Sequence, residues 1–264
     1  MLQGPLRTVP RTGAVTVCLL GDFRVLKHGV AVALRQGGKG EQLLGRLALR
    51  SPDGVPREAL LACLWPDSEG GLAGQSLNTL VYSLHRLLGD ALAGRPPVLL
   101  RGGRYFLNSG AGVTVDVEAF DVAAQAGDRL ASIGDRHGAL VSYRGALALY
   151  AGDLAFGSDI VALVERERLR SRHLTIMSRL ADTYFATAEY DRALDCALDL
   201  LADDPCREDA HRMAMRCLVR LGFRSQALRQ YGICREALAM EFDAVPERAT
   251  EALYELVRLD PARA

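Results

Sequence analysis

A repeated pattern of small residues constrains the fold of this chain more than any other feature. Three segments begin with a small residue, carry Ala five positions later, and carry Tyr or Ala four positions after that. These positions are Gly134-Ala139-Tyr143, Ala188-Ala193-Ala197 and Gly222-Ala227-Tyr231. The second and third segments lie 34 residues apart, and the first lies 54 residues before the second. Such a spacing predicts paired helices that stack along the chain, with one insertion after the first copy.

A period of 34 residues with small side chains where two helices cross is typical of tetratricopeptide-like repeats. Ala suits the crossing because a bulkier side chain would hold the paired helices apart. The second copy also carries Ala181, Tyr184 and Pro205 at the expected offsets. We expect one long helix over Ile160–Glu189 that absorbs the insertion, and a capping helix over Pro246–Arg258. Three repeats reach the minimum for a stable stack, so this half is predicted to be all-α.

The first half of the chain has a different pattern. Val15–Leu20, Phe23–Lys27 and Val30–Leu34 are rich in β-branched residues and are separated by turn signals. They predict a small antiparallel sheet. Glu41–Leu49 and Arg57–Leu64 then show the apolar period of two short helices.

A third helix and a hairpin complete this half. After an expected loop over Asp67–Gly74, the segment from about Gln75 to Leu88 carries a broad apolar stripe. Val98–Leu100 and Arg104–Leu107 flank two glycines, a pattern that predicts a β-hairpin. Sheet, helix, two further helices and hairpin is the order of a winged helix, whose third helix enters the DNA major groove.

The polar face of the third helix suits base recognition. It is predicted to present Gln75, Asn78, Thr79, Tyr82 and Arg86, with Ser83 and His85 on its flanks. Gln and Asn can bind adenine edges, Arg can pair with guanine, and Thr or Tyr can reach a thymine methyl group or a phosphate. A solvated helix face with no partner is the alternative interpretation of the same residues.

The charge of the chain is divided between its halves. The total is 32 basic and 32 acidic residues, so the formal net charge is zero. Through Gly110 there are 13 basic and 7 acidic residues, and beyond it 19 basic and 25 acidic residues. The resulting net charges of +6 and −6 make a polyanionic partner more plausible for the first half.

Other classes of protein find little support. No apolar run approaches the length of a membrane span, and no secretory signal is visible. The six cysteines form no CxxC pair or zinc spacing, which fits reduced thiols in a cytoplasmic protein. The five histidines are scattered. We therefore expect no catalytic residues, no cofactor and no metal, and we do not expect an enzyme.

One glycine-rich segment resembles a phosphate-binding loop without matching it. The segment is Gln36–Gly40. If its Gly38-Lys39 pair belonged to a Walker loop, Gly would be needed at the position of Ala33, and Ser or Thr at the position of Gly40. The start of the following helix, with Lys39, could still bind a DNA phosphate.

The combined features resemble a known family. Leu64-Trp65-Pro66-Asp67, the third helix and the LLRGGRYFLN hairpin are similar to the OmpR-type winged helix of the antibiotic regulatory proteins. Val113–Asp121, the segment 207–231 and Pro246–Arg258 are similar to their bacterial transcriptional activation domain. The resemblance covers about residues 15–260, and its C-terminal block is the most specific part.

The resemblance implies a cytoplasmic activator that binds direct repeats near promoters as two adjacent protomers and contacts RNA polymerase. Members often activate secondary-metabolite gene clusters. By position, the third helix supplies its polar face to DNA and the hairpin supplies Arg101 and Arg104. Family recognition helices usually carry several Arg, whereas this one has His85-Arg86 followed by two leucines, so fewer DNA contacts are expected. With no receiver or ATPase segment in the sequence, the chain resembles the short form of the family.

The sequence therefore predicts a mainly α protein with three parts. Residues 1–13 form a flexible N-terminus, residues 14–109 an N-terminal winged helix-turn-helix domain (α+β), and residues 114–260 an all-α TPR-like helical repeat domain. The predicted function is sequence-specific, DNA-binding transcriptional activation. The alternative is a protein-interaction or adaptor module whose winged helix no longer reads DNA.

Overall fold

The structure is a computed structural model that describes residues 13–67 and 70–261. The predicted flexible segment 1–13 lies outside these residues except for Gly13. Internal contacts divide the chain into two compact units. The first unit contains the chain up to Gln125 together with Gly145–Arg170, and the second contains Ala126–Arg144 together with the chain from Ser171 onward. This division differs from the domains expected from the sequence, because residues 145–170 pack within the first unit.

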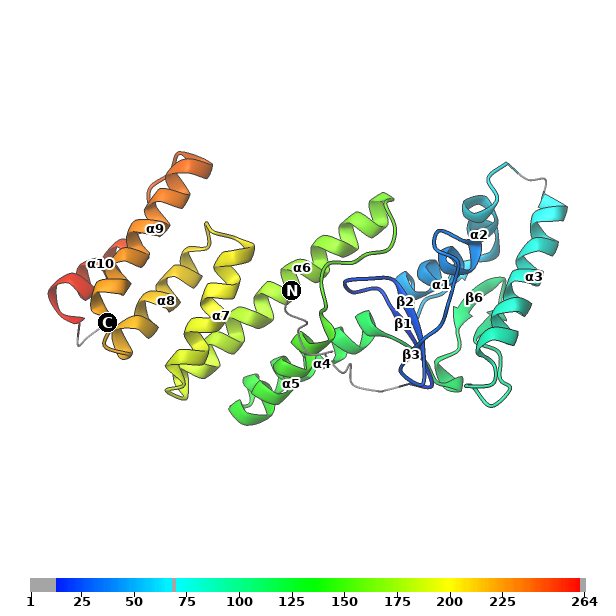
Figure 1. Ribbon diagram of the computed structural model, residues 1–264, viewed down its shortest axis with the longest axis horizontal. Coiled ribbons are helices and arrows are strands. Elements are labelled where there is room, and N and C mark those ends of the chain that lie inside the picture. The colour runs from blue at the N-terminus through cyan, green and yellow to red at the C-terminus, as the bar shows by residue number, and fades with distance from the viewer. Residues whose placement is uncertain (1–12, 68–69, 262–264) are drawn as a thin grey trace. The chain divides into compact units, whose positions relative to one another are not determined.

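The first unit begins with a four-stranded sheet (Figure 1). β1 (Val15–Cys18), β2 (Arg24–Lys27) and β3 (Val30–Ala31) pair antiparallel, which confirms the predicted sheet with a shorter third strand. β7 (Val113–Val115) pairs parallel with β1 and completes the strand order β3-β2-β1-β7. This fourth strand is contributed from almost a hundred residues further along the chain, and the sequence did not predict it.

Three helices and a second sheet follow, in the order expected for a winged helix. The helices are α1 (Lys39–Leu49), α2 (Arg57–Leu64) and α3 (Gly70–Leu88). β4 (Val55–Pro56), β6 (Arg104–Leu107) and β5 (Val98–Arg101) form an antiparallel sheet in that spatial order. Leucines from all three helices are buried and form the core of this part: Leu43, Leu44, Leu47, Leu60, Leu64, Leu77, Leu84 and Leu88.

The predicted loop over Asp67–Gly74 is wrong, because α3 already begins at Gly70. Glycine has a low helix propensity, so Gly70, Gly71 and Gly74 concealed the extra turn. Packing overrides that propensity here. Ala73 is buried, and a Cβ atom at Gly74 would lie 2.7 Å from Nη2 of Arg57.

Three further helices connect the winged-helix part to the repeats. A short 3₁₀ turn (Ser109–Ala111) precedes β7, and α4 (Asp116–Ser132), α5 (Arg136–Leu149) and α6 (Ile160–Ala186) follow it. At the start of α4 the buried Asp116 carboxylate accepts hydrogen bonds from the backbone N–H groups of Leu19 and Leu20, each at 2.9 Å. Asp116 thereby fixes the first turn of α4 to the end of β1.

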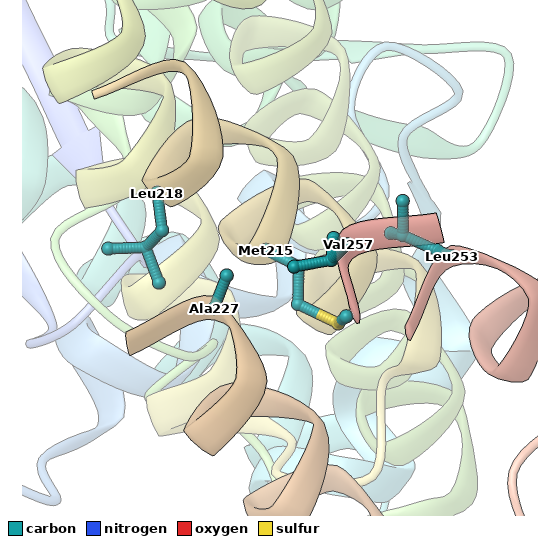
Figure 2. Packing of buried hydrophobic residues seen from close by; sticks show 5 residues of the cluster. All are labelled: Met215, Leu218, Ala227, Leu253 and Val257. Carbon is teal, nitrogen blue, oxygen red and sulfur yellow. The ribbon is translucent and has the colours of Figure 1, made fainter. Parts of the chain in front are cut away.

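The second unit contains the helical repeats. α7 (Tyr190–Asp203) packs against α8 (Glu208–Arg220), α8 against α9 (Arg224–Phe242), and α9 against α10 (Arg248–Leu259). Figure 2 shows Met215 and Leu218 of α8, Ala227 of α9, and Leu253 and Val257 of α10 in one buried cluster. The predicted capping helix is therefore confirmed, and it closes the apolar end of the stack.

The structure explains both kinds of small residue in the repeat pattern. Ala139, Ala193, Ala197 and Ala227 are at most 1% exposed, as expected for residues at helix crossings. The small residues that open each copy have positive φ angles, namely +81° at Gly134, +61° at Ala188 and +86° at Gly222. Small residues are favoured there because each one reverses the chain in the left-handed conformation. The long helix expected to reach Glu189 therefore ends at Ala186.

Three features limit the chemistry of the described residues. The six cysteines are all free thiols. Across residues 13–67 and 70–261, no three His, Cys, Asp or Glu side chains are grouped closely enough to hold a metal ion. No helix in these ranges combines the length and apolar character needed to cross a membrane.

Candidate nucleic-acid interface

From Gln75 onward, α3 places its leucines and its polar residues on different sides. Leu77, Leu84 and Leu88 are buried in the core, Leu80, Val81 and Leu87 beside them are half-buried, and the opposite side of the helix is exposed. At 100° per residue, Gln75, Asn78, Thr79, Tyr82 and Arg86 fall within one stripe on the side opposite the leucines. All five are exposed, as the sequence predicted. We call these five residues the α3 polar face.

Four members of the α3 polar face have no internal partner. Gln75, Asn78, Tyr82 and Arg86 form no side-chain hydrogen bond or ion pair with any residue that the structure describes. The amide groups can each donate and accept, the Tyr82 hydroxyl can do both, and the Arg86 guanidinium has five N–H donors. The face therefore presents its full hydrogen-bonding capacity outward.

The hydroxyl groups and His85 are bonded to the backbone nearby. Thr79 Oγ1 donates to the Gln75 carbonyl at 3.0 Å, and Ser83 Oγ donates to the Leu80 carbonyl at 2.7 Å. Both oxygens retain lone pairs that can accept a hydrogen bond. His85 Nε2 lies 3.1 Å from the Gly94 carbonyl oxygen, so this ring connects α3 to the loop before β5. Its remaining nitrogen can still contact a partner.

The hairpin confirms the predicted glycine turn. β5 and β6 pair from Val98↔Leu107 to Arg101↔Arg104, which leaves Gly102 and Gly103 as a two-residue turn with φ angles of +53° and +74°. Positive φ at both central positions is the requirement of a type I′ turn, and glycine meets it without strain. The two arginines therefore flank the tip of the hairpin.

These two arginines differ in their contacts. The Arg101 side chain is exposed and bonds to none of the described residues. Arg104 donates from Nε to the Asp53 carbonyl at 3.1 Å and from Nη2 to the Gly54 carbonyl at 2.8 Å. Arg104 thus fixes the loop before β4 to the hairpin. Only its other N–H groups remain for a phosphate.

The structure places Lys39 close to α3, whereas the sequence predicted it as a separate phosphate site. Lys39 Nζ donates to the Leu64 carbonyl and lies 5.7 Å from the centre of the Trp65 ring. Lys39 and Trp65 line one shallow depression together with Gln75, Thr79 and Ser83 of α3. Sequence reasoning did not identify Trp65 as part of this surface. Its only signal was a large aromatic residue directly after α2.

The interface has a coherent chemical character. Exposed amide, hydroxyl and guanidinium groups follow one face of α3, and Lys39 adds a positive charge beside it. Separately, Arg101 stands at a hairpin tip. Amides and guanidinium groups are the side chains that bind base edges, and cations at the margins bind phosphates.

Comparison with known proteins adds a family assignment. Residues 115–258 match the family described as bacterial transcriptional activator domain, which is more than half of the chain. No curated protein sequence matches.

The fold resembles solved structures of low sequence identity. The structure of Mycobacterium tuberculosis EmbR in complex with a low affinity phosphopeptide is 20% identical, with a TM-score of 0.71 over 95% of this chain and 68% of that chain. A C-terminal TPR-containing domain of a Plasmodium falciparum putative FK506-binding protein has 19% identity and a TM-score of 0.42, covering 56% of this chain and 93% of that one. The TPR2B domain of yeast Sti1, in a complex with an Hsp70 peptide, has 13% identity and a TM-score of 0.39, covering 53% and 97% respectively.

The predicted fold class, mainly α with a winged helix followed by TPR-like helices, is confirmed by the EmbR-like fold together with the elements described above. The sequence resemblance to the antibiotic regulatory proteins is confirmed as well. This chain belongs to the bacterial transcriptional activator domain family of transcriptional regulators.

Proposed function

We propose that the chain is a sequence-specific, DNA-binding transcriptional activator that reads DNA with the α3 polar face. The observation that carries this proposal is the unpartnered state of Gln75, Asn78, Tyr82 and Arg86 along one exposed face of α3. These side chains keep all their donors and acceptors for a partner. A DNA major groove offers donors and acceptors to each of them.

In the same proposal, the hairpin contacts the DNA backbone. Arg101 contacts a phosphate or the minor groove beside the base pairs that α3 reads, while Arg104 holds the loop next to the hairpin. Thr79, Ser83, His85 and Lys39 complete the proposed DNA-binding set at the margins of α3. Because only a few cations lie on this surface, the affinity of one protomer is modest, and two adjacent protomers on a direct repeat give tight binding.

The remaining parts of the proposal follow from the family. We infer that residues 14–109 bind the promoter and that residues 114–260 contact RNA polymerase in the cytoplasm. The regulated genes that we propose are those of a secondary-metabolite cluster. The family match, which begins at residue 115, supports the boundary between these two domains.

A gel-retardation titration on the DNA upstream of its own gene tests DNA binding. If about four to six phosphates are neutralised, log affinity falls against log salt concentration with a slope of about −4 to −5. Arg101→Ala makes the slope shallower by about 1 if this side chain contacts a phosphate. Absence of retardation at low salt, with the protein shown to be folded by circular dichroism, would contradict the proposal.

One observation favours a second function. Five of the ten candidate residues are bonded to carbonyl groups of the chain itself, namely Lys39, Thr79, Ser83, His85 and Arg104. This arrangement suits an adaptor module whose winged helix serves as a rigid support and does not read DNA. That function predicts that Arg86→Ala combined with Arg101→Ala leaves all partner binding of the full chain unchanged in a pulldown, and that no DNA is retained.

A further inference from the structure

A second potential binding site lies in the first unit, between the hairpin and the first turn of α4. A cavity of about 490 Å³ is lined there by residues of β5, β6 and the 3₁₀ turn, by Ser51 and Pro52 in the turn after α1, and by Glu118 of α4. Its size falls within the range of sites that bind small molecules. The cavity is separate from the depression beside α3.

Glu118 has an unsatisfied carboxylate oxygen. Its Oε1 atom is buried and has no hydrogen-bond partner in the described part of the chain. The neighbouring Val117 N–H donates to Asp116, and the Asn108 amide, which lines the same cavity, donates to the Pro96 carbonyl. A buried carboxylate oxygen without a donor costs free energy, so such a group in a native fold calls for a partner.

Glu118 is the third residue of α4, at the helix end where the amide dipoles favour acidic side chains. A partner for Oε1 therefore has to bring a donor, and a cationic donor would bind most strongly.

The lining of the cavity also limits the rest of the ligand. Arg101, which forms no bond with any described residue, lines the same cavity. A simple cation would be repelled by Arg101, and a simple anion would be repelled by Glu118. Leu99, Phe106 and Pro52 provide apolar contact surface between polar groups. One ligand that satisfies both charges carries an ammonium group, a carboxylate and an apolar body.

We propose that this cavity binds a free α-amino acid with an apolar side chain. The ammonium group donates to Glu118 Oε1, the carboxylate accepts from Arg101, and the side chain packs against Leu99 and Phe106. The inference requires no DNA, although Arg101 belongs both to this site and to the proposed DNA-binding surface.

Isothermal titration calorimetry on the full chain tests the site, with L-leucine, L-valine, L-isoleucine, L-methionine and L-phenylalanine as probes. For the probe that binds best, we expect the analogue without its ammonium group and the analogue without its carboxylate each to bind at least tenfold more weakly. These two analogues test the assignment on the unaltered protein. Failure of all five amino acids to bind would overturn the proposal.

Two matched variants assign the ammonium contact. Glu118→Gln removes the charge and is expected to weaken binding at least tenfold, whereas Glu58→Gln, on the exposed side of α2, is expected to leave it unchanged. Thermal melts in the absence of ligand show whether each variant is folded. Equal affinity in Glu118→Gln and the unaltered protein would overturn the proposal.

Discussion

Arg86 and Arg101 in the first unit, compared with Arg207 and Arg212 in the second, show two uses of the same side chain. Arg86 and Arg101 are exposed and contact no charged group among the residues described. Arg207 instead donates to both carboxylate oxygens of Asp209, at 3.1 and 2.6 Å, and this pairing lowers the pKa of Asp209. Arg212 donates to the Glu247 carboxylate and, at 2.8 Å, to Thr250 Oγ1.

The comparison teaches that the net charge of a segment does not locate a binding surface. The first half carries a net charge of +6, yet several of its cations stabilise the fold itself. Arg95, for example, donates to the carbonyl groups of Leu92, Gly110 and Ala111. Cations without an internal partner keep all their donors for another molecule, and on α3 and the hairpin these are Arg86 and Arg101.

The largest expected change in stability comes from disturbing the helix packing of the second unit, which contains Arg207 and Arg212. Ala227 is fully buried between α8, α9 and α10 (Figure 2). Ala227→Leu inserts three carbon atoms into this contact and is expected to lower the free energy of unfolding by about 2–3 kcal/mol. Urea unfolding measures this free energy. Ala239→Leu on the exposed side of α9 serves as the control, and an equal loss in both variants would show that the crossing is not close-packed.

A smaller effect is expected from Arg212→Ala. The Arg212 side chain is 20% exposed, and Glu247 is 55% exposed, so solvent weakens this ion pair. Loss of its bonds to Glu247 and Thr250 is expected to lower the free energy of unfolding by about 1–2 kcal/mol. Arg216→Ala on the exposed side of α8 is the matched control, with an expected change of less than about 0.5 kcal/mol. If the two variants were equally stable, Arg212 would not be a structural arginine.

A substitution between uncharged residues measures how much backbone strain alone changes the stability of the second unit. Ala188 has φ of +61°, a conformation that disfavours side chains with a Cβ atom. Ala188→Gly is expected to raise the free energy of unfolding by about 0.5–1 kcal/mol. The reciprocal change Gly222→Ala, at the equivalent turn with φ of +86° and open space around it, is expected to lower it by a similar amount. Thermal melts compare the two, and shifts of the same sign would contradict the shared turn geometry.

The smallest expected effect is a pH dependence in the second unit. His211 is buried, bonded to the Pro205 carbonyl and to Gln230, and burial lowers its pKa below the usual 6.5 despite the opposing influence of Glu208 and Asp209. A histidine with a lowered folded-state pKa binds protons less readily when folded. Stability is therefore present above pH of about 6.5 and is lost as pH falls toward the folded-state value. The free energy of unfolding can be measured across this pH range for the unaltered protein and for His211→Gln. We expect it to change less steeply with pH in the variant.

Local patterns explain why much of this fold could be predicted from the sequence. Two glycines between β-rich runs predicted the turn at Gly102 and Gly103, and the small residues at Ala193 and Ala227 predicted the helix crossings. The exposed stripe on α3 followed from the spacing of the apolar residues on its other side, which include Leu77, Leu84 and Leu88. In each case neighbours within one or two helical turns determine the structure.

Features that depend on distant residues could not be predicted in the same way. β7 pairs with β1 across almost a hundred residues, and the early start of α3 depends on packing against Arg57. The internal bonds of Lys39 and Arg104 depend on carbonyl groups brought near by the fold. Sequence patterns identify residues that can bind a partner, whereas only the structure shows which of them already have one.

The comparison of the arginines is tested most directly by measuring DNA affinity and stability on the same two variants, Arg86→Ala and Arg212→Ala. Fluorescence anisotropy with the upstream DNA and with a random duplex gives the affinity, and urea unfolding gives the stability. Arg86→Ala is expected to weaken binding to the upstream DNA by about 1–3 kcal/mol, more than to the random duplex, with unfolding unchanged. Arg212→Ala is expected to lower stability while leaving DNA affinity unchanged under conditions where it is folded. An Arg86→Ala variant that binds the upstream DNA as tightly as the unaltered protein would contradict the account.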